Sequence, residues 1–465
     1  MTTIETDYLI MGAGASGLAF ADEMLTRSDH HMTIVDKRHA PGGHWNDAYP
    51  FVALHQPSAF YGVESKELSN GRHEMSGPNE GMMSLAPGPQ VTDYFHSIMR
   101  DRLLPSGRDS YFPMSEVTED GKIRSLMSGE TMDVHVRRKT VDATIYTNIV
   151  PKTHTPAFSV AEGVTCVPPN ELPRLAANYE RFVVMGVGKT GLDAVCFLIA
   201  NGMDPEKISL VAPRDPWLWN RATTQPSEAF FHETFGGFAD RQAAIAEASS
   251  ARDFAHRMEA AGVWLRIDPD VEPGFYHGAT SSLREVEMIR RVGEIIRKGR
   301  VKEIHTDKLV LDQGEVTVVP GTLFIDCTAS AIRPRPVVPV FDGDRVSLQM
   351  IRFPQIPFSC ALIAFIETLI DDEAQKNLMC APIPMPDTVE EYMVTLLPDM
   401  MNRYHGGQNK EVRAWINESR LEGYAKIARS IPREDEEKMA VFNRIRELAV
   451  PAVTNVQKII AEQSA

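Results

Sequence analysis

The segment Asp7-Tyr-Leu-Ile-Met-Gly-Ala-Gly-Ala-Ser-Gly17 contains the pattern that decides the fold. An apolar run typical of a buried strand ends at Met11, and glycines follow at GxGxxG spacing. Gly12 permits a tight turn, Gly14 lets the backbone approach a pyrophosphate, and Gly17 lets the next helix pack closely on the strand. The segment therefore predicts a strand, a phosphate-binding turn and a helix.

The residues that follow complete a dinucleotide-binding unit. Apolar residues at helical spacing follow Gly17, and a second apolar run at 32–35 ends in Asp36. The N-terminus of the helix directs free N–H groups and a positive dipole end at a diphosphate, and Ser16 belongs to the same turn. Asp36 can accept hydrogen bonds from both ribose hydroxyls. This order of parts predicts a site for a dinucleotide without a 2′-phosphate.

A second glycine loop, Gly186-Val-Gly188-Lys189-Thr190-Gly191, follows an apolar run at 181–185. The next apolar run, 208–211, ends in Ala-Pro-Arg214 instead of an acid. An arginine can bind a 2′-phosphate with two parallel hydrogen bonds, whereas a carboxylate would repel it. This site is therefore expected to prefer NADPH over NADH, unless Arg214 is only a solvated loop residue. Two such sites in one chain favour a flavoprotein that a nicotinamide reduces.

Three further landmarks give the chain a family resemblance. They are Gly42-Gly43-His44-Trp45 with Tyr49-Pro50, then Arg214-Asp-Pro-Trp217, and then Leu323-Phe-Ile-Asp326-Cys-Thr-Ala329. With the glycine loops, they resemble the flavin-containing and Baeyer–Villiger monooxygenase superfamily over roughly residues 6–335. The resemblance implies an α/β fold with two Rossmann-like dinucleotide-binding domains, one for FAD and one for NADPH. It also implies transfer of one oxygen atom of O₂ to a small organic substrate through a C4a-peroxyflavin.

The chain departs from the family pattern at three places. The fingerprint that precedes the second glycine loop has its glycine at Gly163, but Val-Pro-Pro at 167–169 replaces its histidine. His55 stands six residues after Tyr49, where Baeyer–Villiger enzymes carry an aspartate. The terminal ATG element is Cys-Thr-Ala-Ser at 327–330. These departures concern Baeyer–Villiger oxidation in particular, so N-, S- or C-oxygenation all stay open.

The resemblance assigns site residues. Trp45 is expected to close over the flavin, and His55 to hydrogen-bond it and deliver a proton from a near-neutral pKa, with Gln56 in a similar role. Arg221 is expected to face the nicotinamide or the oxygen adduct, with a surface position as the alternative. The expected cofactor contacts are Gly12, Gly14, Ser16, Gly17, Asp36, Lys37, Gly43, His44, Trp45, Val117 and Asp326 for FAD, and Gly186, Gly188, Lys189, Thr190, Gly191 and Arg214 for NADPH.

The pattern along the chain predicts the domain order. Residues 1–172 form the first part of the FAD domain, and 174–325 the NADPH domain. Within the latter, 226–300 is expected to be a helical insertion, with helices at 239–261 and 283–298. Residues 326–465 return to the FAD domain and end in a helical region, in which the apolar run 358–370 predicts a buried helix.

Composition limits the partners and the compartment. The chain has 465 residues and a formal net charge of −15, which argues against nucleic acid and anionic membranes. Its five cysteines form no CxxC pair, and no histidine cluster has metal spacing, so we expect a cytoplasmic protein without a metal. The oligomeric state stays open, with a homodimer as one option. Two other functions also stay open: an NAD(P)H oxidase or reductase that does not oxygenate, and a flavin-binding protein with a degenerate nicotinamide site.

Overall fold

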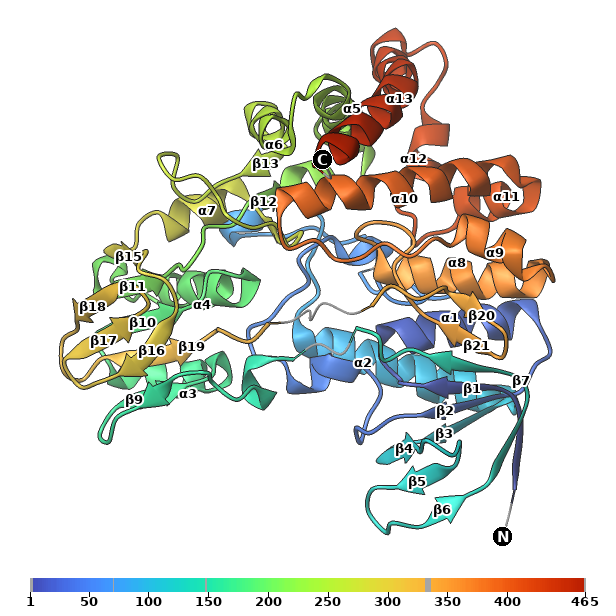
Figure 1. The fold of residues 1–465 in the computed structure, drawn as a ribbon, viewed down its shortest axis with the longest axis horizontal. Helices are drawn as coiled ribbons and strands as arrows, with labels where there is room; N and C mark the ends of the chain where they lie inside the picture. Colours follow the sequence, from blue (N-terminus) through green and yellow to red (C-terminus); the bar gives the residue numbers. More distant parts are fainter. Residues whose placement is uncertain (1–2, 70, 147–148, 331–335, 464–465) are drawn as a thin grey trace.

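The computed structural model describes residues 3–69, 71–146, 149–330 and 336–463. Two sheets lie on opposite sides of the molecule, and their strands are parallel except for the antiparallel edge pair β20–β21 of the first sheet (Figure 1). The first sheet has the order β20-β21-β7-β1-β2-β3, and β1 pairs in parallel with β2 and β7. Its strands are β1 (Ile4–Met11), β2 (Met32–Val35), β3 (Asp109–Phe112), β7 (Val134–Asp142), β20 (Phe341–Asp342) and β21 (Arg345–Ser347). We call this sheet and its helices the first unit.

The second sheet has the order β15-β11-β10-β19-β9, and all of its neighbouring strands are parallel. Its strands are β9 (Thr165–Val167), β10 (Phe182–Met185), β11 (Ile208–Val211), β15 (Glu294–Ile296) and β19 (Leu323–Asp326). Helices α4 (Lys189–Ala200) and α3 (Leu172–Leu175) cover it, and we call this assembly the second unit. Both glycine loops therefore connect a central parallel strand to a helix, as the sequence predicts.

Smaller sheets extend the two units. They contain β4 (Ser115–Val117), β5 (Ile123–Ser125) and β6 (Thr131–Met132); β8 (Ser159–Val160), β16 (Val301–Ile304), β17 (Lys308–Leu311) and β18 (Gly314–Thr317); and β12 (Leu218–Asn220), β13 (Trp264–Leu265) and β14 (Thr280–Ser281). The first of these lies beside β2 at the edge of the first unit.

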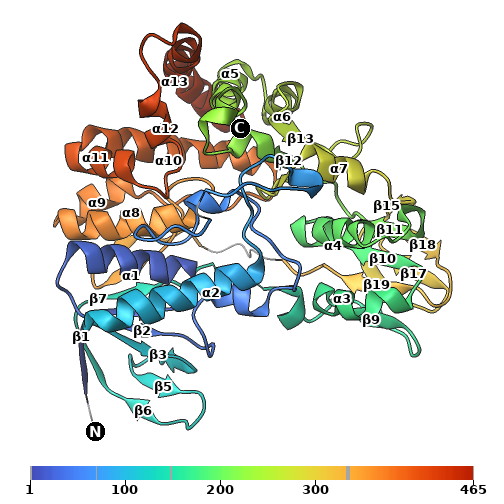
Figure 2. The ribbon, with the colours of Figure 1, turned by 180° about the vertical axis from the view of Figure 1, so that it is seen from behind.

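Helices fill the region above and between the two units (Figures 1 and 2). In the first unit, α1 (Ala15–Arg27) packs against α8 (Ile356–Leu369), and α2 (Gly88–Ile98) also contacts α1. The cap consists of α5 (Gly237–Glu247), α6 (Ala251–Ala260), α10 (Val389–Gln408) and α13 (Glu436–Gln463). The remaining helices are α7 (Leu283–Ile289), α9 (Glu373–Met379), α11 (Lys410–Glu418) and α12 (Ala425–Ser430).

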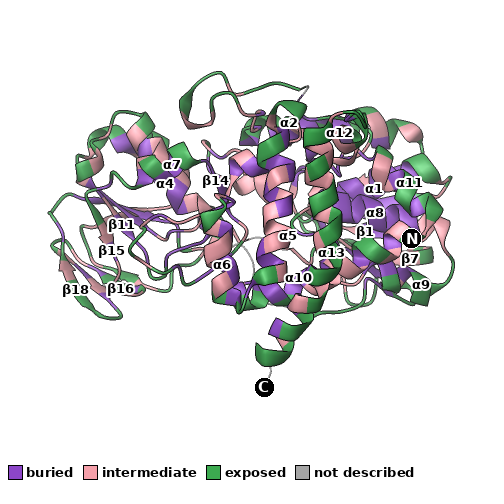
Figure 3. Cartoon of the chain, turned by 90° about the horizontal axis from the view of Figure 1, so that it is seen from above, coloured by how far each residue is buried: buried purple, intermediate pink, exposed green. Residues whose placement is uncertain are grey.

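Each part has its own buried core. The core of the first unit includes Phe20, Phe95 and the buried face of α8, and that of the second unit includes Phe182 and Leu210. The cap has an aromatic core that includes Trp264. Buried residues follow α8 and the inner faces of the cap helices when the molecule is seen from above (Figure 3). The predicted helical C-terminal region, with a buried helix over the apolar run 358–370, is thus confirmed.

The domain boundaries differ from the sequence prediction. Strands β8 and β9, at 159–167, belong to sheets of the second unit, so the chain leaves the first unit before residue 159 and not after residue 172. Likewise, β19 ends at Asp326 inside the second sheet, and the chain rejoins the first sheet only at β20. These strands are two to four residues long, and such short segments carry too little periodicity to be assigned from sequence.

The insertion is also smaller than predicted. The predicted helix 283–298 ends at Ile289. Gly293, a few residues later, comes so close to the Glu206 backbone that a Cβ would lie 2.5 Å from its carbonyl oxygen. Strand β15 then pairs with β11 in the second sheet. The predicted helix 239–261 is two helices, since Ser250 caps the N-terminus of α6. Within the described residues, no helix is both long and apolar enough to cross a membrane.

Candidate functional site

The first glycine loop is shaped by close backbone contacts. Gly12 has a φ of +108°, which favours glycine, and a Cβ on Gly17 would lie 2.0 Å from the Gly12 carbonyl oxygen. Helix α1 begins after Gly14 without a side-chain cap, so its first N–H groups are free to bind a ligand. Gly43 lies against this loop, because its added Cβ would be 3.1 Å from the Gly14 Cα. A diphosphate fits this cradle.

Asp36 stands at the end of β2 and closes the loop. Its carboxylate accepts hydrogen bonds from the Ala13 N–H at 2.6 Å and from the Arg38 N–H at 2.7 Å. The side chain is buried, yet it lines the cavity described below. Two backbone donors therefore fix the carboxylate where β2 meets the loop, which is the position that a ribose-binding acid requires.

The second glycine loop repeats this construction. Gly186 has a φ of +107°, and a Cβ on Gly191 would lie 1.9 Å from the Gly186 carbonyl oxygen. A Cβ on Gly188 would meet no atom within 4 Å, so this glycine opens onto free space. Helix α4 begins after Gly188, again without a side-chain cap. This second cradle also fits a diphosphate.

Both loops open into one cavity of about 2030 Å³. Gly12 and Gly14 line it from the first unit, Gly186 and Gly188 line it from the second, and residues of the cap line it as well. Two dinucleotides bound at the two loops would therefore share one cavity, which is the arrangement that electron transfer between them requires.

The structure brings most of the predicted site residues to this cavity. The predicted residues that line it are Gly12, Gly14, Ser16, Asp36, Lys37, Gly43, His44, Trp45, His55, Gln56, Val117, Gly186, Gly188, Lys189, Thr190 and Arg214. Gly17 and Gly191 are packing positions beneath the loops. Asp326 is buried and accepts a hydrogen bond from the Thr328 N–H at 2.9 Å, while Cys327 and Thr328 reach the cavity. Asp326 thus holds the loop that lines the site.

The GGxW segment forms a short 3₁₀ helix, η1 (Gly43–Asp47), at the first loop. Trp45 donates from Nε1 to the Tyr61 hydroxyl at 2.8 Å and stacks with His44 at a ring distance of 5.4 Å. Trp45 is therefore held in one orientation on the cavity wall.

Lys37, another predicted site residue, forms an ion pair with Glu116 at 3.0 Å.

His55 lines the cavity but cannot deliver a proton in the way expected from a near-neutral pKa. Burial, above all, lowers the pKa of His55, and together with the nearby cations Lys189 and Arg221 it brings this pKa to about 3. The imidazole is therefore neutral at physiological pH, and the sequence-based expectation about its pKa was wrong. A neutral imidazole can still donate or accept a hydrogen bond.

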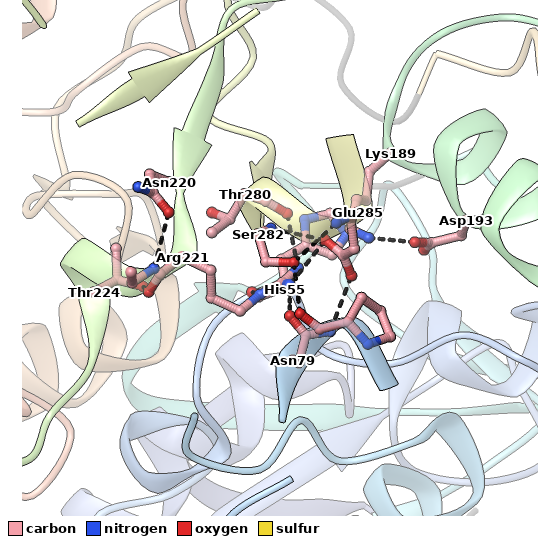
Figure 4. Close-up of polar contacts among 12 residues, drawn as sticks. His55, Asn79, Lys189, Asp193, Asn220, Arg221, Thr224, Thr280, Ser282 and Glu285 are labelled. Atoms are coloured by element: carbon pink, nitrogen blue, oxygen red, sulfur yellow. Dashed lines mark hydrogen bonds and ion pairs between the residues drawn. The ribbon is translucent and has the colours of Figure 1, made fainter. Parts of the chain in front are cut away.

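Arg221 is neither on the surface nor on the cavity wall. Its side chain is fully buried and forms an ion pair with Glu285 at 2.8 Å (Figure 4). It also donates to the His55 carbonyl at 2.8 Å, to the Thr280 carbonyl at 3.0 Å and to the Asn79 side chain. Arg221 thus fastens the segment that carries His55 to β14 and α7, which is a structural role that neither sequence alternative included.

Glu285 holds this network together from the other side. Burial raises the pKa of Glu285, but Lys189 and Arg221 outweigh burial and hold it at about 2. Glu285 also accepts a hydrogen bond from the Ser282 N–H and so completes the capping box of α7. A conventional capping pattern in the sequence, Ser-Leu-Arg-Glu at 282–285, is the signal that could have located this residue.

Arg214 lines the cavity, and its guanidinium is already paired with a carboxylate of the protein. Its guanidinium forms two hydrogen bonds with Asp387, at 2.8 and 3.0 Å, and His277 Nε2 lies 2.7 Å from the same carboxylate. The Arg214 hydrogen bond, above all, lowers the pKa of Asp387 to about 2. Arg214 is therefore presented to the cavity as a pair with an acid from the C-terminal region, which sequence reasoning did not identify.

Tyr49, Lys189 and Asp193 form a further contact between the two units. The Tyr49 hydroxyl donates to Asp193 at 2.7 Å, and Lys189 pairs with the same carboxylate. The i, i+4 spacing of Lys189 and Asp193 is visible in the sequence, but the contact from Tyr49 is not. Across the chain as described, no group of three or more His, Cys, Asp or Glu side chains has metal-binding geometry.

Comparisons with known proteins agree with this architecture. The NAD_binding_8 family, described as an NAD(P)-binding Rossmann-like domain, matches residues 10–63. Among solved structures, cyclohexanone monooxygenase bound to ε-caprolactone superposes with a TM-score of 0.51 at 13% identity, covering 79% of this chain and 87% of that chain. The polycyclic ketone monooxygenase of Thermothelomyces thermophila gives 0.50 at 11% identity, covering 98% and 89%.

The sequence relatives are much closer than these structures. The uncharacterized proteins Rv2000 of Mycobacterium tuberculosis and Mb2023 of Mycobacterium bovis are each 43% identical to the chain over 448 residues, which is 95% of this chain and 82% of theirs. The chain thus shares its fold with these two monooxygenases. By its sequence, the chain belongs to the family of Rv2000 and Mb2023.

Proposed function

We propose that the protein is an FAD-dependent, NADPH-driven monooxygenase that acts on a small organic molecule with O₂. The observation that carries this proposal is that both glycine loops and the Gly42–Trp45 segment open into one cavity. The neighbouring solved structures include a cyclohexanone monooxygenase and a polycyclic ketone monooxygenase, which supports the reaction class. Another solved neighbour, from Rhodococcus sp. Phi1, is bound to NADP⁺.

The first unit supplies the residues that would hold FAD. The loop Gly12–Gly17 and the N-terminus of α1 offer N–H donors to the diphosphate. Asp36 offers its carboxylate to the ribose, and Val117 lines the same end of the cavity. Trp45, fixed by Tyr61, restricts the space next to the loop.

The second unit supplies the residues that would hold NADPH. The loop Gly186–Gly191 and the N-terminus of α4 offer donors to its diphosphate, with Lys189 and Thr190 on the cavity wall. Arg214 is the candidate for the 2′-phosphate, for which the phosphate would have to compete with Asp387.

Within this proposal, a bound flavin supplies the redox chemistry and the activation of O₂. The protein contributes orientation and a dry environment. His55, which is neutral, and Gln56 offer hydrogen bonds at the cavity wall, while Arg221 holds the backbone of His55 in place. Residues of the cap helices α5, α10 and α13 line the cavity, so a bound substrate would replace water there.

A stopped-flow experiment on the purified protein tests the proposal. The protein is reduced anaerobically with NADPH or NADH and then mixed with O₂, with and without candidate ketones and sulfides. We expect bound flavin, faster reduction by NADPH, and NADPH consumption matched by oxygenated product. Flavin that NADPH reduces and O₂ reoxidises, with only hydrogen peroxide as product for every substrate, would favour an oxidase. A purified protein that binds no flavin would refute the proposal.

A further inference from the structure

Arg241 is a cation on the cavity wall without a carboxylate partner. It lies in α5 of the cap, which packs beside α13 and α6 (Figure 3), and its side chain lines the cavity. Within the described parts of the chain, no carboxylate oxygen lies within 4.0 Å of its guanidinium nitrogens. Its guanidinium carbon lies 5.8 Å from the Trp219 ring centroid and 5.9 Å from that of Tyr392. Two aromatic rings thus lie near the charge, and no carboxylate of the described residues forms an ion pair with it.

The nearest acids in this part of the wall are already engaged. Asp399 pairs with Arg403 at 3.0 Å and accepts a hydrogen bond from the Phe353 N–H at 3.0 Å. Glu422 lies 3.7 Å from Arg352. Among the described residues, this region therefore carries three guanidinium groups, of Arg241, Arg352 and Arg403, but only two carboxylates. Arg241 is the guanidinium of these three that remains without a carboxylate of the described chain in an ion pair.

Two adjacent residues on this part of the wall each have a buried polar atom without a hydrogen-bond partner within the described part of the protein. These atoms are Arg241 Nε and Gln242 Oε1. Native proteins pair most buried polar atoms, so two unpaired ones on a cavity wall indicate a place where a polar ligand binds. Gln242 lines the cavity next to Arg241.

An aromatic surface faces the same part of the cavity. Phe235, Phe238, Tyr424 and Phe442 all line it. The rings of Phe238 and Tyr424 are 5.1 Å apart, and those of Phe235 and Phe442 are 5.2 Å apart. These side chains offer a preformed apolar surface to a ligand whose polar end lies at Arg241.

We propose that Arg241 binds the carboxylate of the substrate, and that the apolar body of the substrate packs against this aromatic surface. A guanidinium and a carboxylate match in geometry and form two parallel hydrogen bonds. A bound carboxylate would also neutralise the charge of Arg241, whereas a water molecule, which has no net charge, would not. This assignment rests on the proposed function, and it makes the substrate class an organic carboxylic acid with an apolar body.

Calorimetric titration of the flavin-bound full-length protein tests the assignment. The probes are benzoate, phenylacetate and decanoate, each compared with the neutral amide of the same skeleton. We expect at least one carboxylate to bind roughly tenfold or more tightly than its amide, because a hydrogen bond to a charged group that lacks other partners is strong. We expect Arg241→Met to reduce carboxylate affinity by a similar factor and to remove the preference over the amide.

Arg252→Met is the matched control. Arg252 lies in the neighbouring helix α6 and pairs with Glu272 at 3.1 Å on the surface, away from the cavity lining. This variant is expected to bind as the wild type does. Equal binding of carboxylates and amides by the wild-type protein would overturn the proposal without any variant, as would failure of all three carboxylates to bind.

The nucleotide provides the other possible source of an anion at Arg241. If Arg241→Met weakens binding of adenosine 2′,5′-bisphosphate and leaves carboxylate binding intact, the cation serves the nucleotide and the proposal is overturned. Flavin content and flavin reduction by NADPH are measured on the same samples. Their loss in the wild-type protein would refute the proposed function, whereas a normal flavin with no carboxylate preference would refute only the assignment of Arg241.

Discussion

Replacement of Arg221 by methionine removes a fully buried cation and leaves Glu285 with one charged partner fewer. The pKa of Glu285 falls from 4.5 to about 2 in the folded protein, which corresponds to roughly 3 kcal/mol of stabilisation of its charged form. Removal of one partner of a buried ion pair typically costs 3–5 kcal/mol. Because Lys189 stays beside Glu285, we expect the low end, a loss of about 3 kcal/mol in the free energy of unfolding.

The pH dependence of this loss has a definite sign. A carboxylate with a lowered pKa stabilises the fold above its unfolded-state pKa, and this stabilisation is lost as pH falls from 4.5 toward 2. In Arg221→Met, the pKa of Glu285 rises, so the variant loses less stability on acidification than the wild type. The difference in the free energy of unfolding between wild type and variant is therefore expected to be smaller by about 1 kcal/mol at about pH 4 than at neutral pH.

Urea unfolding followed by tryptophan fluorescence at both pH values measures these differences. Arg252→Met is the control, because its exposed ion pair is expected to contribute about 1 kcal/mol or less. Arg221→Met/Glu285→Gln is expected to recover part of the loss, since the amide preserves the capping position and leaves no charge at positions 221 and 285. The reasoning is refuted if the free energy of unfolding of Arg221→Met lies within about 1 kcal/mol of the wild-type value. It is also refuted if the difference between the two proteins is larger at low pH than at neutral pH.

Three further predictions concern the cavity. Gly188→Ala is expected to fold normally, because its Cβ meets no atom within 4 Å, but to lose NADPH affinity in fluorescence titrations; equal affinity would contradict the assignment of this loop. His55→Gln is expected to keep the pH profile of NADPH-driven flavin reduction, because the pKa of His55 is already lowered to about 3; loss of a limb near neutral pH would contradict this. Asp387→Asn releases Arg214 and is expected to raise the ratio of kcat/KM for NADPH to that for NADH roughly two- to fivefold, as suits an exposed ion pair. Arg214→Ala should remove that preference, and an unchanged ratio in both variants would exclude Arg214 as the 2′-phosphate ligand.

The sequence predicts best where each local segment carries its own signal. The apolar runs before and after each glycine loop correspond to β1, β2, β10 and β11, which pair in parallel as such units require. The glycine positions also follow from backbone geometry, since a side chain at Gly17 or Gly191 would collide with the loop backbone. These features depend on neighbouring residues only, so the fold and the two cradles could be predicted.

Prediction fails where a partner lies far away along the chain. Strand β9 pairs with β19, about 160 residues later, and its three residues alone do not distinguish it from a loop. Arg221 meets Glu285 and the loop at Asn79, and nothing in the residues beside Arg221 indicates that it is buried. Asp387 reaches Arg214 from the C-terminal region. Such contacts are set by tertiary packing, which a short window of sequence does not encode.

The charge of the chain illustrates the difference between global and local information. A net charge of −15 argues against long stretches of polyanion as partners, yet the proposed ligands are all anions. The two facts are compatible, because exposed charges are screened beyond about 8 Å at physiological ionic strength. Ligand binding then depends on cations at the cavity wall: Lys189 beside the second loop, Arg214 held by Asp387, and Arg241 without a carboxylate partner. Of these three, Arg241 does not have to release an acid of the protein before it binds an anion, so the strongest dependence on ligand charge is expected at the cap.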